Sequence, residues 1–225
     1  MAVLLVPGFM LDADLWSDIA RDLEPFGPVT HADPAHAESI EQMAAQALAA
    51  APARFTLIGF SMGGYVARAI QRRAPERVSG LVLIATSARP DGGLQEQRRG
   101  VLAGVTPDRF RGVSKASIRQ ALSPASEGDA ALVERIHAMS LRLGGEVFRR
   151  QALFQRHGDL ERLADIACPT LIVAGAHDRL RTAEEAAEMA LAIPGARMEI
   201  VEAGHMIPME APAQLSRILR SFLSA

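Results

Sequence analysis

The chain has 225 residues, of which 49% are hydrophobic and 22% are charged, and its formal net charge is −2. This size and apolar content predict one globular domain with a sizeable core, and the near-neutral charge gives no reason to expect a nucleic acid or an acidic membrane surface as partner. A single cysteine, Cys168, excludes an internal disulfide.

Strand-like and helix-like stretches alternate along the chain, which is typical of a parallel sheet with helices on both faces. We therefore predict an α/β fold: a three-layer, doubly wound, mostly parallel sheet of about six strands. Strands are expected at 2–6, 28–32, 54–59, 78–85, 169–174 and 197–202. Helices are expected at 14–24, 39–50, 62–73, 183–192 and 211–223.

The alternation fails in the middle of the chain, at residues 87–163. Helical candidates follow one another there without a strand, near 93–103, 114–122, 129–143 and 145–157. We expect this stretch to form a helical cap, or lid, inserted into a core made of residues 1–86 and 164–225. The alternative is a packed structural subdomain with no gating role.

The third strand ends in the most informative motif of the chain. Residues 59–63 read Gly-Phe-Ser-Met-Gly and stand between an apolar strand and a helical stretch. A serine between two glycines at such a junction is how a chain exposes a strained nucleophile above a parallel sheet, because side chains at the glycine positions would collide. Ser61 is therefore the candidate nucleophile, and an ordinary turn is the alternative.

A serine nucleophile needs a base and a group that orients the base. His205 stands on a glycine-flanked loop after the last strand, and Asp178 follows the strand before it. Singly, His205 could be a surface histidine and Asp178 a turn or helix cap. Together with Ser61 they give the chain order nucleophile, acid, base that belongs to one fold. Asp33, beyond another strand end, is the rival for the acid.

At this point the sequence resembles the α/β-hydrolase superfamily over nearly its whole length, in particular small bacterial serine esterases with a helical cap. Residues 2–10 resemble the strand and oxyanion loop of that family, with Pro7 where many members have histidine and with Gly8 kept. The resemblance implies that the backbone N–H groups of Phe9 and Met62 form an oxyanion hole. Members usually begin with an antiparallel hairpin, which is missing here, so we predict a reduced, all-parallel sheet.

Methionine and aromatic side chains near the motifs indicate an apolar pocket. Flexible thioethers form an adaptable lining, although ordinary core packing explains such residues equally well. The candidate pocket residues are Met10, Phe60, Met206 and Met209. Small to medium apolar substrates are the expectation.

The predicted function is hydrolysis of carboxylic esters through an acyl-enzyme on Ser61. The same triad could instead cleave carbon–carbon bonds or form peracids as a perhydrolase. A ligand-binding signalling protein with very slow turnover is the alternative from a different class.

Other site types find little support. His31 and His36, with Asp33 between them, lack a complete ligand set, so no metal is expected. Nucleotide-binding glycine motifs are absent, so no cofactor is expected. The N-terminal apolar run is too short to span a membrane and lacks the features of a secretory signal. We expect a cytoplasmic monomer or homodimer whose partner is a small-molecule ester.

Overall fold

The computed structural model of the chain describes residues 2–92, 104 and 106–225. The helix expected at 93–103 lies outside the described residues. None of the helices in the described ranges is both long enough and apolar enough to cross a membrane.

The described residues form one six-stranded sheet in which every neighbouring pair is parallel, in the order β2-β1-β3-β4-β5-β6. The strands are β1 (Ala2–Val6), β2 (Val29–His31), β3 (Phe55–Phe60), β4 (Val78–Ile84), β5 (Thr170–Gly175) and β6 (Arg197–Val201). The predicted all-parallel, six-stranded sheet is confirmed, with strand ends close to those expected.

Burial explains why the inner strands are apolar throughout. All residues of β1, β3 and β5 are buried, whereas the edge strands β2 and β6 are largely exposed or half-buried. A parallel sheet covered on both faces needs continuous apolar runs. Along β1, Leu4 packs in the core on one face, while Val3 and Leu5 pack in the core on the other.

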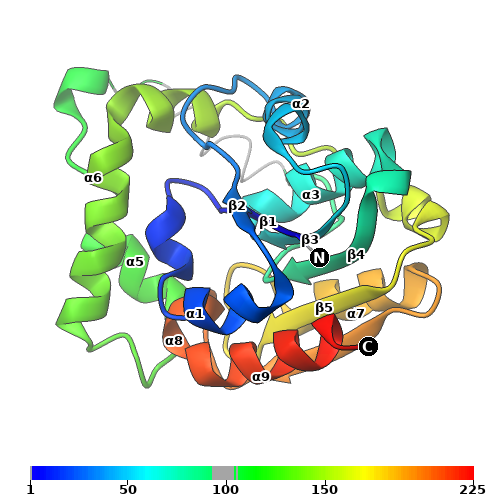
Figure 1. Ribbon diagram of the computed structural model, residues 1–225. Coiled ribbons are helices and arrows are strands. Elements are labelled where there is room, and N and C mark those ends of the chain that lie inside the picture. Colours follow the sequence, from blue (N-terminus) through cyan, green and yellow to red (C-terminus); the bar gives the residue numbers. More distant parts are fainter. Residues whose placement is uncertain (1, 93–103, 105) are drawn as a thin grey trace.

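Helices cover both faces of the sheet, as Figure 1 shows. One core contains side chains of α2 (Ile40–Ala50), α3 (Met62–Arg73) and α7 (Ala183–Ala192). The opposite core contains side chains of α1 (Ala20–Leu23), α8 (Ile207–Glu210) and α9 (Pro212–Leu223). The sheet is thus the middle layer of three.

The helix expected at 14–24 is broken. The structure has a 3-10 turn at Ala13–Trp16, the short α1, and a second 3-10 turn at Glu24–Phe26. The Asp12 carboxylate caps the first turn, and Pro25, which has no N–H, stands in the second. Turn chemistry at both ends therefore outweighs the apolar spacing on which the prediction relied.

Between β4 and β5 the described residues form helices and turns and no strand, and residues 87–163 are called the inserted segment below. It contains α5 (Lys115–Ala121), α6 (Ala130–Ala152) and a 3-10 turn at Pro107–Arg109, and a second 3-10 turn, Leu160–Asp165, runs across its end. The helices expected at 129–143 and 145–157 are both present, as the two parts of α6 on either side of Gly144, whose φ of 79° is not helical. The second part ends at Ala152 and not at 157. Figure 1 shows α6 standing at one side of the molecule beside α5.

Candidate active site

Ser61 occupies a strained position between β3 and α3. Its φ of 52° lies in the left-handed region, and it is the residue before the first turn of α3. Such a backbone costs a non-glycine residue about 1–3 kcal/mol and persists only where neighbours enforce it. Here Ser61 N–H donates to the Ile84 carbonyl over 2.9 Å, and the Thr86 hydroxyl donates to the Ser61 carbonyl over 2.7 Å.

The two motif glycines allow the backbone to pack this closely. A Cβ on Gly59 would lie 2.5 Å from the Gly63 carbonyl oxygen, and one on Gly63 would lie 2.3 Å from the Val6 carbonyl oxygen. Both distances are shorter than any real carbon–oxygen contact. The sequence therefore needs glycine at both positions to turn directly from β3 into α3.

The three side chains singled out as a triad lie in one hydrogen-bonded chain. His205 Nε2 is 2.9 Å from Ser61 Oγ, and His205 Nδ1 is 2.8 Å from Asp178 Oδ2. His205 and Asp178 are buried. With Nδ1 as donor to the carboxylate, the Nε2 lone pair faces the serine hydroxyl, which is the arrangement a general base requires.

Asp178 is oriented by its own turn as well as by the imidazole. Its second oxygen, Oδ1, accepts the N–H groups of Leu180 at 2.8 Å and Arg181 at 2.9 Å. The Asx-turn that was the alternative reading of Asp178 is thus present together with the bond to His205. One carboxylate fills both roles because each oxygen has a separate partner.

Glu210 organises the loop that carries His205, and sequence reasoning missed this role. Its Oε2 accepts the N–H groups of Ser123 and Gly204, and its Oε1 accepts the N–H of Met206. In addition, His205 N–H donates to the carbonyl of Ala121, the last residue of α5, over 2.7 Å. A glutamate five residues after a histidine carries no sequence signal for these contacts.

The loop after β1 runs beside Ser61. A Cβ on Gly8 would lie 3.2 Å from Ser61 Cβ, so the chain entering Phe9 passes directly against Ser61. Met62 begins α3, where the first N–H groups have no partner inside the helix. These positions suit the oxyanion roles expected for Phe9 and Met62, which stay predictions. Met10, the residue after Phe9, has a left-handed φ of 56°.

A cavity of about 400 Å³ opens beside Ser61 and His205. Its apolar lining includes Phe9, Met10, Phe60, Ile118, Ile136 and Met206. Two cationic side chains, Arg156 and Arg181, also line it, 3.7 and 3.9 Å from the buried Asp91 carboxylate. Of the candidate pocket residues, Met209 is not part of this lining and packs in the core instead.

The remaining candidates lie elsewhere. Asp33, the rival acid, pairs with His36 at 2.7 Å on the surface and not with His205. Burial acts to raise the pKa of Asp33, but the Ala35 N–H and His36 outweigh it and lower that pKa. Over the ranges that the structure describes, no three His, Cys, Asp or Glu side chains are grouped for a metal ion. Burial raises the pKa of the Cys168 thiol, which makes it a poor nucleophile.

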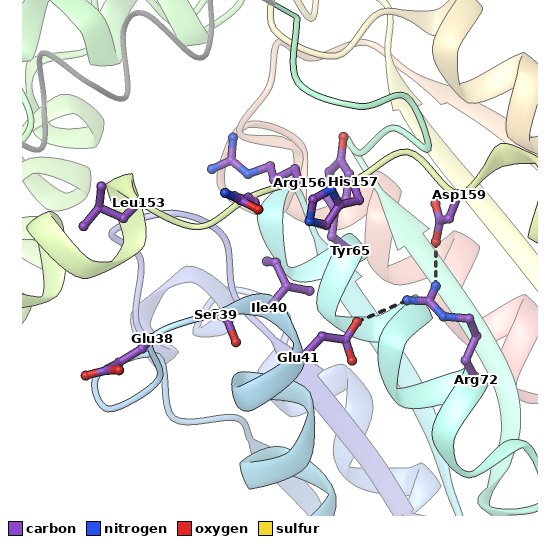
Figure 2. A pocket seen from close by; sticks show the side chains of 11 residues that line it. Glu38, Ser39, Ile40, Glu41, Tyr65, Arg72, Leu153, Arg156, His157 and Asp159 are labelled. Atoms are coloured by element: carbon purple, nitrogen blue, oxygen red, sulfur yellow. Dashed lines mark hydrogen bonds and ion pairs between the residues drawn. The ribbon is translucent and has the colours of Figure 1, made fainter.

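A second hollow, of about 260 Å³, lies between α2, α3 and the end of the inserted segment. Figure 2 shows Arg72 there, bonded to Asp159 on one side and to Glu41 on the other. Its lining contains neither Ser61 nor His205. Arg72, Glu41 and Asp159 are engaged with one another there, which ties α2 and α3 to the end of the inserted segment.

Comparison with known proteins agrees with the fold. The sequence matches the alpha/beta hydrolase fold family over residues 2–212, and the chain belongs to that family. Proteins similar to it include esterases and other hydrolases.

Two curated relatives are pimeloyl-acyl-carrier protein methyl ester esterases. The one from Photobacterium profundum is 29% identical over 98% of this chain and 94% of its own length. The one from Pectobacterium carotovorum is 32% identical over 79% of this chain and 76% of its own length. Among solved structures, a thermophilic esterase from Thermogutta terrifontis with malate bound superposes with a TM-score of 0.86 at 28% identity, covering 100% of this chain and 89% of that one.

Proposed function

We propose that this protein is a serine hydrolase that cleaves carboxylic esters through an acyl-enzyme on Ser61. The unbroken line of hydrogen bonds from Asp178 through His205 to Ser61, beside an apolar cavity, carries the proposal. Relatives that are named esterases support the same class of reaction.

In the acylation step, Ser61 Oγ attacks the ester carbonyl carbon while its proton passes to His205 Nε2. The carbonyl oxygen becomes an oxyanion, for which the N–H groups of Phe9 and Met62 are the proposed donors. One such donor contributes about 10²–10³ in rate. The carbon–oxygen bond of the alcohol then breaks, and His205 returns its proton to the leaving oxygen.

Deacylation repeats these steps with water. His205 removes a proton from water as its oxygen adds to the acyl carbon, and then gives that proton to Ser61 Oγ as the acyl bond breaks. Asp178 holds the imidazole tautomer and stabilises the imidazolium at both stages. Free acid and restored serine are the products.

The cavity favours an acyl or alcohol group of small to medium size and apolar character. Its lining is largely aliphatic, aromatic and thioether. The pimeloyl esters named for two relatives carry an apolar methylene chain, which such a lining would accept. We therefore expect chain length to be the main determinant of kcat/KM.

Stopped-flow hydrolysis of p-nitrophenyl esters from acetate to dodecanoate tests the proposal. Wild type should give a burst followed by steady turnover. Ser61→Ala should lose about 10⁴–10⁶ in kcat and Asp178→Asn about 10⁴, since the triad acts as a unit. Thr170→Val, which removes a buried hydroxyl bonded to Cys168, is the control and should keep full activity.

The alternative functions give different results in this assay. A burst without turnover would favour a slow ligand-binding signalling protein. No burst with any ester, but Ser61-dependent turnover of a β-diketone, would favour carbon–carbon hydrolysis, and preferential peracid formation with added peroxide would favour a perhydrolase. Full ester turnover by Ser61→Ala would overturn the serine mechanism.

A further inference from the structure

Gln151, in the last turn of α6, joins the loop after β1 to the loop after β2. The side chain is fully buried. Its Oε1 accepts the Met10 N–H over 2.8 Å, and its Nε2 donates to the Pro34 carbonyl over 2.9 Å. One primary amide thus bonds the loop after β1 and the loop after β2 at once.

Met10, whose N–H donates to Gln151, is one of the residues of the chain with a strained backbone. Met10 has a left-handed φ of 56°, which for a residue with a Cβ costs free energy and needs neighbours that enforce it. The Met10 side chain is buried, so its N–H would lack a hydrogen bond without Gln151. The contact therefore fixes a backbone conformation that the chain would otherwise avoid.

The same face of α6 also contacts the residue before Met10. The rings of Phe9 and Phe148 lie 5.6 Å apart, and Phe148 is three residues before Gln151, on the same helical face. Met10, Val147 and Phe148 form a small apolar cluster of their own. Side chain and backbone of the loop after β1 are thus both held by one turn and a half of α6.

We propose that Gln151 is a positioning residue for the oxyanion hole. The Met10 N–H lies in the peptide plane that follows Phe9, so anchoring that plane restricts the dihedral angles of Phe9 and the direction of the Phe9 N–H. This inference rests on the proposed function, because it matters only if Phe9 N–H binds an oxyanion. Gln151 touches no reacting atom and acts through Met10.

A role of this kind predicts a selective defect. Misplacing one oxyanion donor weakens binding of the tetrahedral state and leaves binding of the planar ester nearly unchanged. Gln151→Met fills a similar volume and makes neither hydrogen bond. We expect it to lower kcat about 10- to 100-fold, as small displacements in an active site do, and to change KM less than about threefold.

The measurement is kcat and KM with p-nitrophenyl butyrate, together with the affinity of a phenylboronic acid, which forms a tetrahedral adduct with a serine nucleophile. Boronate affinity should fall by about the same factor as kcat in Gln151→Met. Gln151→Glu, which full burial favours in the protonated form, keeps a carbonyl oxygen for the Met10 N–H and an O–H for the Pro34 carbonyl, and should recover most of the loss. Gln71→Met makes the same change at another buried glutamine, near the end of α3, and should leave both quantities unaltered.

Three results would overturn the inference. They are wild-type kcat and boronate affinity in Gln151→Met, an equal loss in Gln71→Met, or a loss that appears only in KM. If Gln151→Met does not fold, Gln151→Asn replaces it in the test, because its amide is one methylene too short to make both hydrogen bonds. An unchanged kcat in Gln151→Asn would also overturn the inference. Absence of Ser61-dependent turnover in wild type would instead refute the proposed function, and this inference with it.

Discussion

The connection between β3 and α3, which carries Ser61, and the contact between α6 and the loop after β1 are held by different interactions. At the first, the residues around Ser61 pack backbone against backbone, with Gly59 and Gly63 leaving no room for a Cβ. At the second, two arginines of α6 reach across to the loop after β1. Arg135 and Arg142 have side chains 31% and 50% exposed, and pair with Asp12, Asp14 and Asp18.

This contrast predicts different sensitivities. Close backbone packing is disrupted by one added methyl group but does not depend on salt or pH. Exposed ion pairs tolerate substitution, yet they respond to ionic strength and to protonation of the carboxylates. The position of Ser61 should therefore be robust to conditions. The contact of α6 with the loop after β1 should keep its buried part, around Gln151 and Phe148, and should lose its ion-paired part at high salt or low pH.

The largest effect is expected from Gly63→Ala. The new Cβ would meet the Val6 carbonyl, so β1 or α3 must shift. We expect a loss of about 4 kcal/mol or more in the free energy of unfolding, or failure to fold. Gly128→Ala is the control in urea titrations, because a Cβ there meets nothing within 4 Å. Equal stability of the two variants would show that the junction yields more easily than its geometry indicates.

A buried ion pair adds a third kind of contact, between α3 and the end of the inserted segment. Arg68, only 1% exposed, donates from Nε to both oxygens of Asp159 at 3.0 Å. Asp159→Ala leaves the Arg68 guanidinium buried without the carboxylate that pairs with it. It should lower the free energy of unfolding, measured by urea titration, by about 3 kcal/mol. Glu188→Ala removes the partner of the exposed Arg89 and should cause no measurable change.

A smaller effect is expected from Arg142→Gln on α6. It removes contacts to Asp12 and Asp14 from a half-exposed side chain, which is typically worth less than about 1 kcal/mol. In 1 M NaCl the difference from wild type should shrink further, because salt screens exposed pairs. A salt-independent loss of several kcal/mol would mean that the Arg142 side chain stabilises the fold by packing and not by charge.

The pH dependence of the free energy of unfolding should show the smallest effect, and the one most specific to a single carboxylate. Burial acts to raise the pKa of Asp14, but hydrogen bonds from Ser17 and the charge of Arg135 outweigh it and hold that pKa below its usual value. A depressed folded-state pKa stabilises the fold above the unfolded value of about 3.9, and this contribution is lost as pH falls through the folded pKa. Asp14→Asn should therefore be less stable than wild type at pH 6 in urea titrations, and the gap should close as the pH falls below the folded-state pKa of Asp14.

The sequence was sufficient for the sheet and for the spacing of the triad, and the reason is physical. Continuous apolar runs such as β3 and β5 have few alternatives to a buried parallel strand, and glycines at 59 and 63 are required by sterics alone. Local rules of this kind need no knowledge of distant partners. They also explain why Asp178 was recognised both as a turn residue and as a candidate acid.

Two of the contacts missed from the sequence join segments far apart in the chain. Gln151 bonds Met10, which is 141 residues away, and Glu210 bonds Ser123, which is 87 residues away. Neither residue has a local pattern that marks it. The expected helix at 14–24 failed for the opposite reason, since local capping by Asp12 overrode an apolar pattern that was read too broadly.

The hydrogen bond from His205 N–H to Ala121 has a consequence for substrate entry. Because the acceptor is the last residue of α5, lifting this helix away from the sheet would break the bond that steadies the base loop. Access gained by that movement would come at the expense of proton transfer. In the proposed mechanism, a substrate that reaches Ser61 without displacing the end of α5 would meet an intact base loop.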